Sequence, residues 1–150
     1  MVDVHTKNIS HRLAQAQCLV KLPPEVLVHF NGKDFELKKG PVFQTAIIAG
    51  TMAAKKTSEL IPLCHQIPLE QVQIKIQLSE INGEQIVVIG SQVRCQARTG
   101  VEMEALVATQ IAALTIYDMC KALSHKIVIG ECKLIHKSGG KNTFTAEELS

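Results

Sequence analysis

Residues 72–89 read VQIKIQLSEINGEQIVVI, and this stretch decides the fold. Apolar and polar residues alternate over 72–78, which is typical of a strand with one buried face. Asn82-Gly83 follows, and because both residues tolerate positive φ the pair favours a tight hairpin turn. A second apolar run, 86–89, continues towards Arg94. The stretch therefore predicts two neighbouring antiparallel strands.

Helical segments flank this predicted hairpin on both sides. Upstream, we expect a helix over residues 43–59 that ends before Pro62. Downstream, Thr99-Gly100-Val101-Glu102 matches a capping box and predicts a helix that runs to about Leu123.

Two further strands are expected near the ends of the chain, over residues 14–21 and 127–135. A short helix after Pro23-Pro24, stopped by Asn31-Gly32, is interpreted as an insertion. The remaining order, β-α-β-β-α-β, predicts an α+β fold: a ferredoxin-like (split βαβ) antiparallel sheet with helices packed on one face. Because the other face must be covered or solvated, we expect the subunit to be oligomeric.

Length and composition set the class of protein. The 150 residues predict one domain over 1–150, and a 46% hydrophobic content is enough for a buried core. A net charge of +2 does not by itself indicate a nucleic-acid or membrane partner. Four Phe, one Tyr and no Trp leave few side chains on which RNA bases could stack, which disfavours RNA binding through the sheet.

The cysteines and the apolar segments indicate where the protein works. Five cysteines without a C-x-x-C pair argue against both a disulfide framework and a zinc ribbon. Residues 1–5 show no secretory pattern, and the apolar region 105–123 is interrupted by polar residues, which favours a buried helix over a membrane span. We therefore expect a reduced, soluble, cytoplasmic protein.

Two constellations pair carboxylates with a helix. Glu102 and Glu104 would suit a helix N-terminus, or they could hold a guanine-like edge, since a carboxylate accepts two adjacent N–H donors. Asp118 and Lys121 are three positions apart and therefore neighbours on one helix face. They form either a modest ion pair or, in this apolar helix, an acid–base couple whose partly desolvated members tune each other's pKa.

Two other constellations carry lysines or a Cys-His pair. Lys55 ends a helical segment, and Cys64-His65 follows in an apolar loop; this is either an ordinary helix end or a pocket wall where His65 binds or protonates substrate. The spacing does not suit a metal. The glycines of Lys137-Ser138-Gly139-Gly140-Lys141 form either a solvated tail or a loop whose N–H groups approach a phosphate. Lys38-Lys39-Gly40 leaves the same alternatives.

Taken together, these segments resemble one family, the cyclic pyranopterin monophosphate synthases of the MoaC type in molybdenum cofactor biosynthesis. The matching stretches, in order, are residues 1–4, 39–40, 48–50, 53–55, 60–65, 99–106, 112–122 and 137–141. They span nearly the whole chain.

The resemblance implies a lyase that converts a cyclo-dihydro-GTP, made by an upstream radical S-adenosylmethionine GTP cyclase, to cyclic pyranopterin monophosphate with release of pyrophosphate. It also implies a homohexamer (a trimer of dimers) with the pocket between subunits, and it requires no redox cofactor. The sequence itself shows no built-in metal site. Asp118 and Lys121 fall on catalytic positions. The substrate-binding positions are Leu63, Cys64, His65, Met103, Glu104, Glu102, Lys39, Lys55 and Lys137, with Lys141 as a weaker candidate.

The chain departs from the family pattern at four places. Pro41 stands where an Asp is usual, Ile47 replaces an Arg, Gln66-Ile67 precede Pro68, and Asn142-Thr143 replace Ser-Gly. These departures motivate an alternative function, a non-catalytic purine-nucleotide-binding regulatory module on the same fold.

Overall fold

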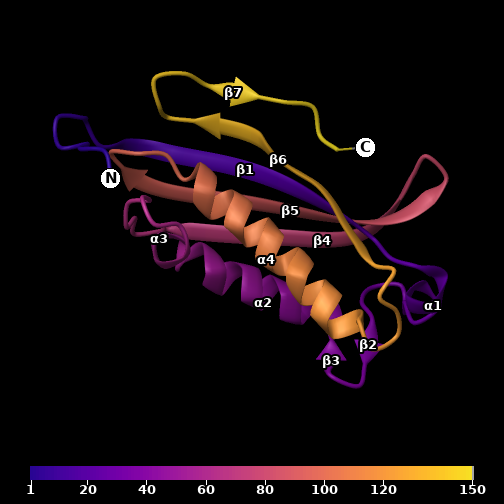
Figure 1. The fold of residues 1–150 in the computed structure, drawn as a ribbon. Helices are drawn as coiled ribbons and strands as arrows, with labels where there is room; N and C mark the ends of the chain where they lie inside the picture. The colour runs from indigo at the N-terminus through magenta and orange to yellow at the C-terminus, as the bar shows by residue number, and fades with distance from the viewer. Residues whose placement is uncertain (150) are drawn as a thin grey trace.

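The computed structural model describes residues 1–149, and its centre is a five-stranded antiparallel sheet in the order β4-β5-β1-β6-β7. The strands are β1 (Ser10–Lys21), β4 (Gln71–Ile81), β5 (Glu84–Ala97), β6 (Val128–Ser138) and β7 (Phe144–Thr145). Helices α2 (Val42–Ala54) and α4 (Glu102–Cys120) lie side by side on one face (Figure 1). The smaller elements are α1 (Pro24–Leu27), α3 (Thr57–Leu60), β2 (Glu36–Leu37) and β3 (Gly40–Pro41).

Without these small elements and the two-residue β7, the chain runs β-α-β-β-α-β, as the sequence predicts. The first strand, β1, pairs with β5 on one side and β6 on the other, which is the ferredoxin-like arrangement. The predicted hairpin turn is confirmed, with φ of 51° at Asn82 and 78° at Gly83. Strand periodicity, the Asn82-Gly83 turn and the order of strands and helices together predicted this arrangement.

The two faces of the sheet differ in polarity. Cys18 and Val20 of β1 and Ile89 of β5 are buried in one cluster with α2 and α4. Gln15 and its cross-strand partner Gln92 are joined by a side-chain hydrogen bond of 2.8 Å, on the side away from the helices. Here, several glutamines of β1, β4 and β5 line a shallow cavity of about 290 Å³. The helix-covered face thus holds the main core, while the other face is largely polar.

Helices α2 and α4 approach closely where α2 has a glycine. A Cβ placed on Gly50 would lie 2.6 Å from the carbonyl oxygen of Ala108 and 2.7 Å from Cδ1 of Ile74. The missing side chain lets α2 rest on both the sheet and α4. None of the helices within residues 1–149 is both long and apolar enough to cross a membrane.

Two predicted helix boundaries are wrong. The expected helix over 43–59 is interrupted: α2 ends at Ala54 and α3 begins at Thr57. The Thr57 hydroxyl donates to the carbonyl of Ala54 at 3.0 Å, so a side chain satisfies a helix-end carbonyl and the chain turns.

The predicted capping box at Thr99 does not form. Helix α4 begins at Glu102 after Val101, with no side-chain cap. Glu102 lies over Gly100, where a Cβ would collide with its carboxylate, and pairs with Lys137 at 3.1 Å. The Glu102 carboxylate, which the local pattern assigned to capping, therefore forms a long-range ion pair instead.

Candidate functional site

The predicted site residues lie in two groups at opposite ends of α4. Lys39, Asp118 and Lys121 are grouped at its C-terminal end. Glu102 and Glu104 lie in its first turn. The two ends are about 24 Å apart, because an α-helix rises about 1.5 Å per residue. One chain therefore does not bring all the predicted residues together.

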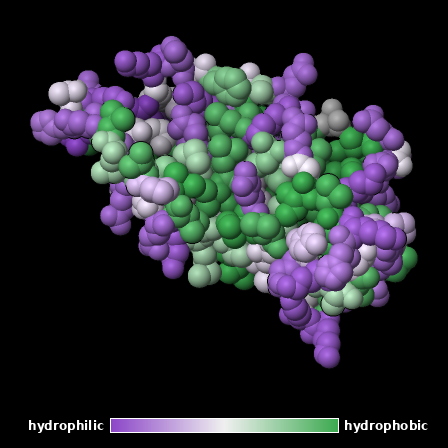
Figure 2. Space-filling view, viewed as in Figure 1, coloured by the Kyte–Doolittle hydropathy of each residue, from purple (hydrophilic) through white to green (hydrophobic). Residues whose placement is uncertain are grey.

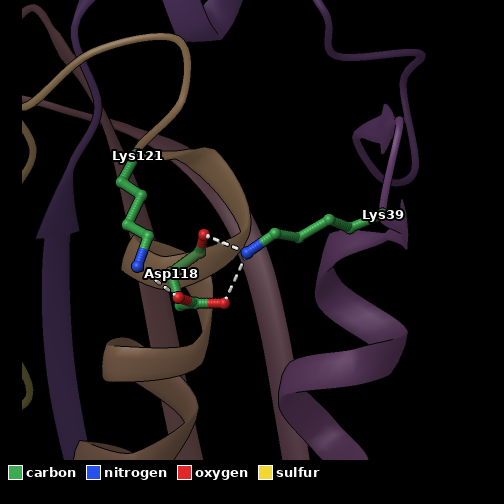
Figure 3. A network of polar contacts seen from close by, with 3 residues as sticks. All are labelled: Lys39, Asp118 and Lys121. Atoms are coloured by element: carbon green, nitrogen blue, oxygen red, sulfur yellow. Dashed lines mark hydrogen bonds and ion pairs between the residues drawn. The ribbon is translucent and has the colours of Figure 1, made fainter.

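The C-terminal group is a three-residue ionic cluster, which we call the Asp118 triad: Lys39, Asp118 and Lys121 (Figure 3). Lys121 Nζ lies 2.8 Å from Asp118 Oδ1, and Lys39 Nζ lies 2.7 Å from Oδ2. Lys39 also donates to the backbone carbonyl of Asp118 at 3.0 Å. The triad joins the turn before β3 to the last turn of α4, so two distant segments fix the carboxylate.

The lysines determine the charge of the triad. Hydrogen bonds from Lys121, and next from Lys39, lower the pKa of Asp118 to about 2. The carboxylate in turn raises the pKa of Lys121. At neutral pH Asp118 is therefore ionised and Lys121 protonated. In the single chain the Lys121 side chain is 48% exposed and Asp118 is 54% exposed, so the raised pKa of Lys121 reflects its bond to Asp118 and not burial.

The N-terminal group contains a buried carboxylate. Glu104 is only 4% exposed, and burial raises its pKa, with the nearby charge of Glu102 adding to the effect. The half-buried thiol of Cys64 has a raised pKa, first from burial and then from the charge of Glu104. Shifted pKa values of this kind are common in functional sites. The charge of Glu104 acts on the Cys64 thiol, so these two residues lie in the same region of the fold.

His65 and the apolar candidates lie in the same region. His65 Nε2 is 2.7 Å from the carbonyl oxygen of Val2, and because a carbonyl only accepts, Nε2 carries the hydrogen. Leu63 and Met103 are exposed although apolar. Lys55 directly follows α2, which runs antiparallel to α4, so Lys55 is also at this end of the helix pair.

A basic cleft of about 540 Å³ opens beside the Glu102–Lys137 pair. Its lining includes Lys7, Arg12, Arg98, Lys137 and Lys141. The two arginines are not among the site residues predicted from the sequence. They donate to backbone carbonyls at 3.0–3.2 Å and so hold the cleft walls together. The rarity of arginine could have pointed to these residues, because the chain has only three arginines and two of them line this cleft. Within residues 1–149 no cluster of His, Cys, Asp or Glu is arranged to hold a metal.

Fold and site define an α+β protein with a ferredoxin-like sheet, acid–base groups at both ends of one helix and a cleft suited to anions. Residues 1–140 match the MoaC family. The chain belongs to this family.

Relatives from distant organisms have similar sequences over nearly the whole chain. A cyclic pyranopterin monophosphate synthase from Xanthomonas axonopodis pv. citri is 47% identical over 148 residues, which is 99% of this chain and 88% of that protein. A protein of the same name from Magnetococcus marinus is 50% identical over 142 residues, 95% of this chain and 85% of its own. The molybdenum cofactor biosynthesis protein 1 of Drosophila melanogaster is 49% identical over 148 residues, which is 26% of its length.

Proposed function

We propose that this chain is a lyase of early molybdenum cofactor biosynthesis that converts cyclo-dihydro-GTP to cyclic pyranopterin monophosphate and pyrophosphate. Its relatives carry the name of that synthase, and its own residues suit the chemistry. The observation that carries the proposal is the Asp118 triad, an ionised carboxylate held between two ammonium groups. The reaction opens one ring, closes another and forms a cyclic phosphate, so it needs several proton transfers.

The triad suits proton donation at neutral pH. Lys121 is protonated there, and Asp118 keeps its ammonium group charged and oriented. Lys39 adds a second positive charge next to the same carboxylate. Substrate phosphate oxygens approaching this site would meet preorganised donors, which is the usual form of electrostatic stabilisation in enzymes.

The other end of α4 suits substrate recognition. The buried Glu104 carboxylate can accept two adjacent N–H groups from a guanine-like edge. The exposed apolar side chains of Leu63 and Met103 suit contact with the ring faces. The basic cleft beside Lys137 suits the triphosphate, because ammonium and guanidinium groups bind phosphate through charge-assisted hydrogen bonds.

Because the two groups are about 24 Å apart along α4, we also propose that the complete site forms between two chains. In a two-fold dimer the Asp118 end of one copy would face the Glu104 end of its partner, and each dimer would hold two such sites. Figure 2 shows a broad hydrophobic area over α2 and α4, and the exposed apolar side chains of these helices are Ile48, Met52, Met103 and Leu114. This surface supports assembly, and a homohexamer made of three dimers is the proposed state.

The reaction places the chain after an enzyme that supplies the cyclised nucleotide, for which we propose the radical S-adenosylmethionine GTP cyclase. A cytoplasmic location suits both this supply and the chemistry of the five free cysteines, since thiols remain reduced in that compartment. No redox cofactor is invoked.

The direct test supplies cyclo-dihydro-GTP to purified protein and measures pyrophosphate and the cyclic phosphate product. A well-folded protein that binds the substrate in calorimetry but leaves it unchanged would contradict the proposal and favour the regulatory module instead.

The shared site has its own test, based on complementation. We expect Asp118→Asn and Glu104→Gln each to be inactive, because each lacks one half of every site. When the two variants are unfolded and refolded together, random pairing should restore about a quarter of wild-type activity, since half the dimers are mixed and each has one intact site. Each variant refolded alone is the control, and a mixture no more active than these controls would refute the shared site.

A further inference from the structure

Helix α2 begins without a cap of its own. Its N-cap residue is Pro41, at φ −69° and ψ 127°, and no side chain from that position bonds to the helix. Proline has no hydroxyl, amide or carboxylate to offer, whereas the first backbone N–H groups of a helix lack intrahelical partners. Those donors must be satisfied from elsewhere.

Residues 34 and 35 accept hydrogen bonds from the first three backbone N–H groups of α2, those of Val42, Phe43 and Gln44. The N–H of Val42 donates to the carbonyl of Phe35 at 3.1 Å. The N–H groups of Phe43 and Gln44 donate to the two oxygens of the Asp34 carboxylate, at 2.7 and 3.2 Å. Asp34 is only 8% exposed, so these are buried, charge-assisted bonds at the positive end of the helix dipole. Asp34 thus performs the capping function from seven positions before Pro41.

The segment between Asp34 and α2 is a small hairpin that carries Lys39. We call residues 36–41 the Lys39 hairpin: β2 and β3 pair Glu36 with Pro41 and Leu37 with Gly40. Lys38 and Lys39 form its two-residue turn, and Gly40 has a φ of 107°. From this turn Lys39 reaches Asp118 (Figure 3).

Both ends of the Lys39 hairpin are fixed at the same place. At its start Asp34 is held by Asn31, which accepts the Asp34 N–H at 2.9 Å and donates its own N–H to the Asp34 carbonyl at 3.0 Å. The adjacent Phe35 is fully buried, and its ring centroid lies 5.4 Å from that of Phe43 in the first turn of α2. At its end the hairpin continues directly into that turn. Together with the hydrogen bond from Val42 to the Phe35 carbonyl, the Asp34 carboxylate joins the two ends.

We propose that Asp34 is a positioning residue for the Lys39–Asp118 contact: by capping α2 across the base of the Lys39 hairpin, it fixes where Lys39 is delivered. Without the carboxylate, the N–H groups of Phe43 and Gln44 lose their acceptors and the hairpin base opens. Lys39 then samples other positions, and Asp118 keeps only Lys121. The catalytic meaning of this contact rests on the proposed function.

The first experiment compares Asp34→Ala with wild type in two measurements. An NMR titration of the Asp118 carboxyl should show its pKa rise from about 2 towards the ordinary 3.8, because the Lys39 hydrogen bond is lost. The kcat/KM for cyclo-dihydro-GTP should fall about fivefold, the factor that a typical N-cap loss represents as an equilibrium constant. A reduced Tm with unchanged titration and kcat/KM would make Asp34 merely structural and overturn the proposal.

Rescue separates positioning from general destabilisation. Aspartate is a favoured N-cap residue and Pro41 has the extended conformation that an N-cap needs. The double variant Asp34→Ala/Pro41→Asp should therefore recover much of the lost Tm, but not the wild-type titration of Asp118 or the lost kcat/KM, because a cap at the N-cap position does not bond across the hairpin base. A double variant whose Asp118 titration also returned to the wild-type value would overturn the proposal. The rescue is tested in the Asp34→Ala background only, because two carboxylates at the same N–H groups would repel.

Two further variants complete the design. In a Lys39→Ala background, Asp34→Ala should lower Tm but cause no additional loss of kcat/KM, since its effect passes through Lys39; a further loss of about fivefold would refute this. Ser91→Ala is the matched control, because it removes one buried hydrogen bond, to the carbonyl of Ala105, far from the hairpin. It should lower Tm without shifting the Asp118 titration, and a shift would show that this readout follows stability alone.

If Asp34→Ala does not fold, Asp34→Asn retains one acceptor oxygen and should give an intermediate shift of the same sign; a wild-type value would count against the proposal. The titration needs no turnover. Absence of synthase activity in the wild type would therefore refute the proposed function. The role of Asp34 would still be decided by the titration of Asp118.

Discussion

Substituting Gly50 by alanine should separate α2 from α4, and the structure gives the size of the effect. Alanine favours a helix over glycine by about 1 kcal/mol, so propensity alone would stabilise the variant. Against this, the new methyl would lie 2.6 Å from the Ala108 carbonyl oxygen, 2.7 Å from Ile74 Cδ1 and 3.3 Å from Ala112 Cβ. The end of Ile74 can rotate away, but the carbonyl belongs to the backbone of α4 and moves only with the helix.

Overpacking of a well-filled interior costs about 1–3 kcal/mol, and contact with backbone favours the upper part of that range. After the gain in propensity, the expected net loss is about 1–2 kcal/mol. For a chain of this size that corresponds to a fall in Tm of roughly 2–8 °C. Because α4 carries Asp118 and the hairpin that carries Lys39 leads directly into α2, a shift between the helices should also weaken the triad.

The assay is thermal and urea unfolding at one fixed chain concentration, since oligomers have concentration-dependent midpoints. The control is Gly90→Ala, where no heavy atom lies within 4 Å of an added Cβ. It should be neutral or up to about 1 kcal/mol more stable, because alanine reduces the entropy of the unfolded chain. A Gly50→Ala variant at least as stable as wild type would refute the close-packing argument.

Three further predictions concern the site. Lys121→Ala should raise the pKa of Asp118 from about 2 towards its ordinary value. A carboxyl group whose pKa is lower in the folded than in the unfolded state stabilises the fold above its unfolded-state pKa, and this stabilisation is lost as pH falls. The variant should therefore lose less stability than wild type between about pH 4 and 2, which acid unfolding titrations would measure. Glu104→Gln should reduce turnover at least about 100-fold, yet leave stability at pH 7 equal or higher by up to about 1 kcal/mol, because burial disfavours the carboxylate; a large loss of stability with normal kinetics would contradict this. Lys137→Met should change stability by under about 1 kcal/mol, since its pair with Glu102 is partly exposed, but should raise KM; an unchanged KM in steady-state kinetics would remove Lys137 from the substrate site.

The local patterns predicted the strands well because a strand's burial pattern repeats every two residues and needs no knowledge of its partner. Val72 to Leu78 and the Asn82-Gly83 turn appear in the structure where expected, and the helices cover the predicted face. The helix boundaries were less predictable. The end of α2 depends on the Thr57 hydroxyl, and the start of α4 depends on Lys137, a residue far along the chain.

The site was predicted as a set of residues but not as an arrangement. The ion pair of Asp118 with Lys121 could be inferred, because positions three apart on a helix are neighbours. The contact of Lys39 with Asp118 spans 79 positions, and no local spacing encodes it. Arg12 and Arg98 of the cleft were not predicted as site residues for the same reason, because only the pairing of β1 with β5 brings them together.

The openness of the Asp118 triad has a practical consequence for every measurement on this protein. Its three side chains are about half exposed, so their attraction is screened by dissolved ions. The Debye length falls from about 10 Å at 0.1 M to about 3 Å at 1 M ionic strength. Rates taken at different salt concentrations are therefore not comparable, and multivalent buffer anions such as phosphate would compete for the same two ammonium groups.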